Sequence, residues 1–66
     1  MSRSIKTLRR RDDPATDDEI QAAALQFIRK VSGYRQPSAA NREAFDRAVV
    51  EIAGCTRTLF DRLAIR

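Results

Sequence analysis

The chain of 66 residues contains no histidine and no tryptophan, and it has a single cysteine, Cys55. One cysteine cannot form an intrachain disulfide, and a zinc site needs about four nitrogen or sulfur ligands, which this composition does not supply. Without histidine, the imidazole base of Ser-His-Asp and Cys-His catalytic systems is also missing. The sequence therefore predicts no catalytic residue, no metal site and no enzymatic activity.

Glycines and long apolar runs are also scarce. Two glycines are too few for a loop that cradles a phosphate, so no cofactor-binding residue is predicted. No run approaches the roughly 18 apolar residues of a membrane span, and the N-terminus lacks the apolar stretch of a secretory signal. A lone thiol without an export signal favours a cytoplasmic location.

The length itself points to a partner. Sixty-six residues make one domain, close to the size at which a single core gives only marginal stability. Such chains usually rely on disulfides, a metal or a partner subunit. Because the composition excludes the first two, we expect a homo-oligomer, with a dimer favoured.

Residues 1–13 form a basic N-terminal arm without helical periodicity. It could track the phosphates of a nucleic acid, but three of the four aromatic residues lie on helical stripes, which leaves only Tyr34 for base stacking. Nucleic-acid binding is therefore the less favoured alternative to a solvated arm or one that pairs with the acidic residues that follow. The candidate contacts for that alternative are Arg3, Lys6, Arg9, Arg10 and Arg11.

Residues 14–66 read as a helical hairpin. Pro14 disfavours helix at the residue before it, and Thr16 and Glu19 have the spacing of a capping box that begins a helix over residues 17–32. Gly33 suits a left-handed C-cap. A loop over residues 33–37 then leads to a second helix over residues 39–65, with Ser38 as its N-cap.

One long apolar stripe marks the second helix. At 1.5 Å per residue this helix reaches about 40 Å, whereas the first reaches about 24 Å, so apolar surface is left over. We expect the surplus to pair two hairpins into a dimeric four-helix bundle, an all-α fold. The stripe consists of Phe45, Ala48, Val49, Ile52, Thr56, Leu59, Phe60 and Leu63, and the candidate interface is its far part, Ile52, Thr56, Leu59, Phe60 and Leu63.

Other features of the chain offer different covers for the stripe. Ile5 and Leu8, the only large aliphatic residues of the arm, could dock on it. Gly54 could mark a kink that folds the far half back, or a close approach of another backbone. Cys55 extends the apolar face, where a buried thiol acting as a small hydrophobic side chain is the default expectation.

Several segments occur together in an order that resembles a small bacterial family catalogued as domain of unknown function 2277. They are Met1-Ser2-Arg3-Ser4-Ile5-Lys6-Thr7-Leu8, Pro14-Ala15-Thr16-Asp17-Asp18-Glu19-Ile20, Ala22-Ala23-Ala24-Leu25-Gln26-Phe27-Ile28-Arg29-Lys30-Val31-Ser32-Gly33, and Pro37-Ser38-Ala39-Ala40-Asn41 with Ala44-Phe45. The resemblance implies a short bacterial helical protein, encoded alone, with no established activity, substrate or cofactor. Members commonly begin Met-Cys-Arg. Ser2 departs from that pattern and removes the thiol that a redox or metal role would need.

The resemblance adds a second reading of three polar residues. Ser38 and Asn41 are first of all helix-capping residues, but together with Arg3 and Tyr34 they could form a polar patch for an unknown ligand. The candidate patch is Tyr34, Ser38 and Asn41. Taken together, the sequence predicts a non-enzymatic oligomeric assembly or adaptor module, with a nucleic-acid-associated protein as the alternative.

Overall fold

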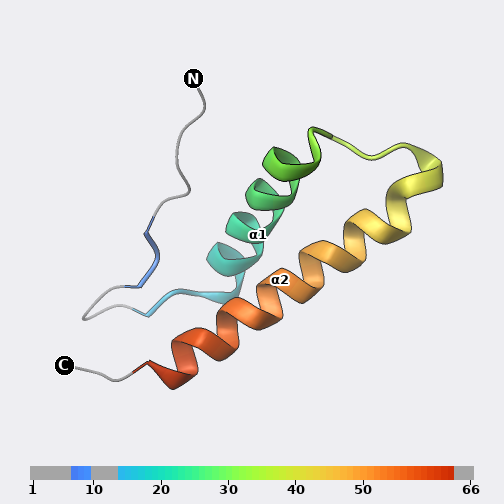
Figure 1. Ribbon diagram of the computed structural model, residues 1–66. Coiled ribbons are helices and arrows are strands. Elements are labelled where there is room, and N and C mark those ends of the chain that lie inside the picture. Colours follow the sequence, from blue (N-terminus) through green and yellow to red (C-terminus); the bar gives the residue numbers. More distant parts are fainter. Residues whose placement is uncertain (1–6, 10–13, 64–66) are drawn as a thin grey trace.

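The computed structural model describes residues 7–9 and 14–63, which form a helical hairpin (Figure 1). The elements are α1 (Asp17–Ser32), a short 3-10 helix η1 (Ala39–Asn41) and α2 (Arg42–Arg62). Within these described ranges there is no strand. The all-α hairpin predicted from the periodicity is therefore confirmed for a single chain.

Capping interactions set both ends of α1. The Thr16 hydroxyl accepts a hydrogen bond from the Glu19 N–H at 3.1 Å, and the Glu19 carboxylate accepts one from the Thr16 N–H at 3.0 Å. At the other end, Gly33 adopts a left-handed conformation with φ 79°, and its N–H donates to the Arg29 carbonyl at 3.0 Å. Because both caps form, α1 spans the residues that the sequence predicts.

The second helical segment differs from the expectation at both ends. Its first turn is a 3-10 turn, in which the Asn41 N–H donates to the Ser38 carbonyl at 3.0 Å. The Ser38 side chain caps no backbone N–H. At the far end, α2 stops at Arg62 because Leu63 turns to an extended conformation, φ −72° and ψ 137°. The expected helix over residues 39–65 was thus too long, since apolar periodicity alone does not locate a helix end that lacks a glycine cap.

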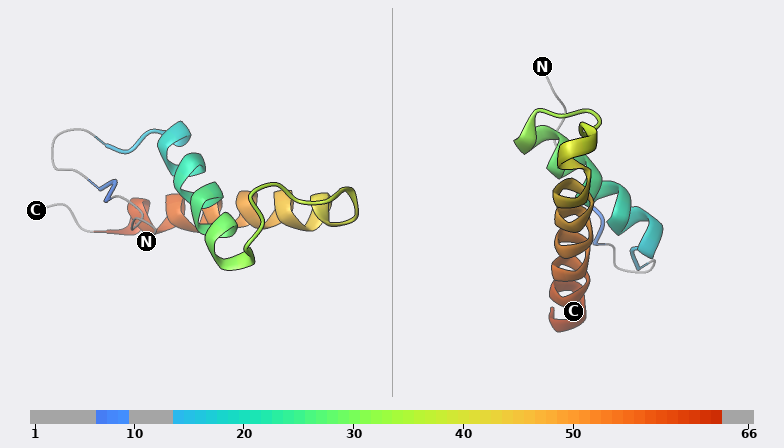
Figure 2. Two further views of the ribbon diagram at one scale, coloured as in Figure 1. Left: turned by 90° about the horizontal axis from the view of Figure 1, so that it is seen from above. Right: turned by 90° about the vertical axis from the view of Figure 1, so that its right-hand side faces the viewer.

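The core lies where the two helices cross. Figure 2 shows α1 passing across α2 at a steep incline. Ala24, which is 2% exposed, lets the helices approach closely. The buried cluster is Ala24, Ile28, Phe45 and Val49, flanked by partly buried Leu25, Ala48, Ile52 and Ala53. Because crossed helices diverge on either side of their contact, apolar residues away from the crossing stay exposed.

Helix α2 runs through Gly54 without a break. A Cβ atom built at Gly54 would meet nothing within 4 Å. The expected fold-back at Gly54 was therefore wrong, and no other described segment approaches this residue closely. Nearby, the guanidinium of Arg57 contacts the carboxylate of Asp17 on α1.

Candidate oligomer interface

The apolar stripe of α2 is covered more fully in its N-terminal half than in its C-terminal half. Phe45 and Val49 are 8% and 6% exposed beneath α1, whereas Leu59 and Leu63 toward the C-terminal end are 52% and 36% exposed. The C-terminal half of the stripe is therefore only partly covered. Of the five predicted interface residues, Ile52, Thr56 and Phe60 are half-buried, while Leu59 and Leu63 are exposed.

Thr56 is the only polar residue in the predicted interface, and its hydroxyl already has a partner. It donates to the Ile52 carbonyl within the same helix at 2.8 Å. A side chain bonded back to its own helix brings no unsatisfied donor to a contact surface. Thr56 can therefore be covered by an apolar partner without losing a hydrogen bond.

Cys55 lies on the surface, which corrects the expectation of a buried thiol. By helical spacing Cys55 lies on the side of α2 next to the one that contains Phe45 and Val49. Small and apolar residues follow one another there at spacings of four, three and four, which is the spacing of a helix-packing seam. We call this line the exposed seam: Ala48 and Ile52, which are half-buried against the core, and Cys55 and Leu59, which are exposed.

The structure brings the three residues of the predicted polar patch together. The Asn41 side-chain amide donates to the Tyr34 hydroxyl and to the Ser38 hydroxyl, each at 3.2 Å. The Tyr34 N–H also donates to the Ser32 hydroxyl at 3.1 Å. All of these residues are exposed. Because the polar groups bond mainly to one another, their arrangement secures the connection between α1 and η1.

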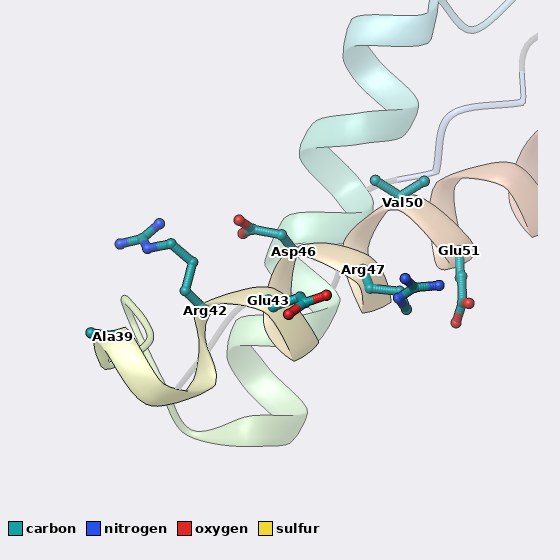
Figure 3. Close-up of a pocket in the computed structure, with 7 residues that line it drawn as sticks. All are labelled: Ala39, Arg42, Glu43, Asp46, Arg47, Val50 and Glu51. Carbon is teal, nitrogen blue, oxygen red and sulfur yellow. The ribbon is translucent and has the colours of Figure 1, made fainter.

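A shallow hollow follows the outer side of η1 and the first half of α2 (Figure 3). Every residue that lines it is exposed, and charges of both signs alternate along it. A ligand there would remain largely in water and would meet no single complementary charge. The lining residues are Ala39, Arg42, Glu43, Asp46, Arg47, Val50 and Glu51.

Comparison with known proteins places the chain in a family. The family model described as an uncharacterised conserved protein, DUF2277, matches residues 1–66. The chain belongs to this family. No curated protein and no solved structure matches it. The DUF2277 assignment agrees with the resemblance noted in the sequence, and it carries no activity or ligand.

The basic arm of this DUF2277 member is described only in part. Arg9 is exposed and Leu8 is half-buried. Figure 1 shows residues 7–9 on the same side of α2 as α1. The remaining predicted nucleic-acid contacts, Arg3, Lys6, Arg10 and Arg11, lie outside the described residues, as does Ile5. Nucleic-acid binding by the arm stays a prediction.

The described residues also bear on two other possibilities, a metal site and a membrane span. No group of three or more Cys, Asp or Glu side chains in this part of the protein lies close enough to hold a metal ion. Within the same residues, neither helix has the length and hydropathy of a membrane span.

Proposed function

We propose that this DUF2277 protein is a non-enzymatic assembly module that acts as a homodimer, in which two hairpins pair through α2 to form a bundle of four helices. The observation that carries the proposal is the exposed part of the C-terminal half of the α2 stripe, Leu59 and Leu63. Leu59 is 52% exposed, although it shares a helical face with Phe45, which is 8% exposed. A second hairpin would bury the part of this face that α1 leaves in water.

The size of the core supports the same proposal. Six hydrophobic residues are buried in the described part of the chain, and four of them make up the cluster between the helices. A core this small gives marginal stability in a chain of 66 residues, and oligomerisation is the common remedy that remains without disulfides or metal. Pairing with an identical chain needs only one self-complementary surface.

The test compares two aspartate substitutions on α2. Light scattering at micromolar concentration should give a dimer for the wild-type chain and a monomer for Leu59→Asp, because the substitution places a charge in the apolar contact. Val50→Asp is the matched control, since Val50 is 63% exposed on α2 but lies outside the stripe. It should remain dimeric.

Two outcomes would contradict the proposal. One is a wild-type chain that is monomeric yet melts cooperatively, which would mean that a single hairpin is sufficient. The other is a Leu59→Asp protein with unchanged mass and stability, which would mean that the C-terminal half of the stripe is ordinary surface. Far-UV circular dichroism of each variant shows whether the helices are retained.

A further inference from the structure

The exposed seam has charged residues along one edge. Glu51 precedes Cys55 by one turn, and Arg62 follows Leu59 by about one turn. The eleven positions from Glu51 to Arg62 correspond to about three full turns, so both side chains lie on the same edge of the helix, about 16 Å apart along its axis. Both are exposed, and neither forms an ion pair with another described residue. The midpoint between them falls between Thr56 and Arg57, toward the C-terminal end of the seam.

This placement is self-complementary for one orientation only. When two identical helices pack antiparallel about a two-fold axis, the same edge of each helix lies on the same side of the contact. With that axis between Thr56 and Arg57, Glu51 of one copy faces Arg62 of the second copy, and symmetry repeats the pair. In a parallel arrangement this edge faces the opposite edge of the second helix, and Glu51 does not meet Arg62.

Apolar side chains of the two copies also lie side by side in the register that pairs the charges. An axis between Thr56 and Arg57 brings Leu59 of one copy level with position 54 of the other, next to Cys55 and about 3 Å along the axis from Ile52. Ala48 and Cys55 are small, which permits close approach of the two helices. Thr56, near the axis, has its hydroxyl already bonded within α2. The register that pairs the charges therefore also keeps Leu59 in apolar surroundings.

We infer that the partner of the exposed seam is a second copy of this chain, docked with α2 antiparallel to α2 and aligned by two symmetric Glu51–Arg62 pairs. The inference rests on the proposed homodimer and adds its orientation and register. Apolar side chains supply most of the binding in such a contact, whereas the charges reject misaligned and parallel pairings. Glu51 and Arg62 are thus the residues that determine which dimer forms.

Charge reversal tests the orientation. Sedimentation equilibrium of the full chain at low salt should show a dimer Kd about tenfold higher for Glu51→Arg and for Arg62→Glu, because each change turns two attractions into two repulsions. The double variant should return to within about twofold of wild type, because the pairs re-form with reversed sign. An equimolar mixture of the two single variants should form heterodimers more tightly than either variant forms homodimers. Glu43→Arg, an exposed change elsewhere on α2, is the matched control and should leave Kd unchanged.

Disulfide trapping gives a readout that is independent of affinity. In a Cys55→Ala background, Glu51→Cys mixed with Arg62→Cys should cross-link between the two variants in preference to within either one. A wild-type monomer up to millimolar concentration would overturn both the dimer and its orientation. A dimer that is insensitive to both charge reversals, fails to recover in the double variant, or cross-links mainly between identical positions would overturn the antiparallel register alone and leave the homodimer standing.

Discussion

The two glycines offer a measurement in which the same substitution is expected to have opposite effects. Gly54 lies inside α2, whereas Gly33 ends α1 with φ 79°. A Cβ atom at either position would meet nothing within 4 Å. Contacts with the rest of the protein are therefore absent at both sites, and the local backbone conformation determines the effect of adding a methyl group.

Gly54→Ala should stabilise the protein. Glycine in an exposed helix interior is about 0.5–1 kcal/mol less favourable than alanine, because it loses more backbone entropy on folding. Gly54 follows Phe45 by about two and a half turns, so it lies on the side of α2 opposite the stripe and the new methyl group does not enter the interface. For a domain of this size a gain of about 1 kcal/mol raises Tm by about 4–8 °C.

Gly33→Ala should destabilise it by about 1–2 kcal/mol, because alanine in the left-handed region brings its Cβ too close to the backbone carbonyl. Thermal unfolding followed by circular dichroism measures both variants. The chain concentration is held constant because dimerisation makes Tm depend on it. A Gly54→Ala protein no more stable than wild type would refute the reasoning, as would a Gly33→Ala protein with an unchanged Tm.

Two further predictions concern the connection between the helices and the basic arm. Asn41→Ala removes both side-chain hydrogen bonds that secure the connection and should lower the free energy of unfolding in urea by about 1 kcal/mol. Tyr34→Phe removes only one of these bonds and should lower the free energy of unfolding by about half as much. Equal losses in the two variants would contradict a role for the Asn41 amide as the donor of both bonds. For the arm, we expect the full chain and a chain lacking residues 1–11 to bind short duplex DNA equally weakly at low salt, because the five basic residues of the arm are followed at once in the sequence by five acidic residues. Salt-sensitive binding that disappears on deletion would instead establish the nucleic-acid alternative.

The features that the sequence predicts well are those that depend on a few neighbouring residues. The capping box needs only Thr16 and Glu19, and the left-handed end of α1 needs only Gly33, so each follows from its own local chemistry. The hairpin follows almost as directly, because two amphipathic helices joined by a short polar connection have few other ways to bury their apolar sides.

The features that the sequence did not predict depend on how the helices cross. Cys55 stands at the margin of the apolar stripe, and whether such a residue is covered is decided by the direction in which α1 passes over α2. The sequence also did not predict that the turn before α2, η1, is a 3-10 helix. The Asn41 side chain bonds to Tyr34, a residue on the far side of the connection, and such a contact is not visible in local spacing. Nothing in the sequence distinguished Glu51 and Arg62 from other surface charges, because their possible role depends on which side of α2 is exposed.

The two seams of α2 give a reason for assembly that does not depend on any single residue. A helix packed against one neighbour buries one apolar seam, and α1 takes that place along the side that contains Phe45 and Val49. The part of the exposed seam that α1 does not reach, Cys55 and Leu59, needs a third helix to cover it. One hairpin has none to offer, but a second identical hairpin brings a third and a fourth helix in the same step. A chain near the lower size limit for independent folding thus gains the core that it lacks by pairing with itself, and the Glu51–Arg62 pairs that we propose would fix the register of that pairing.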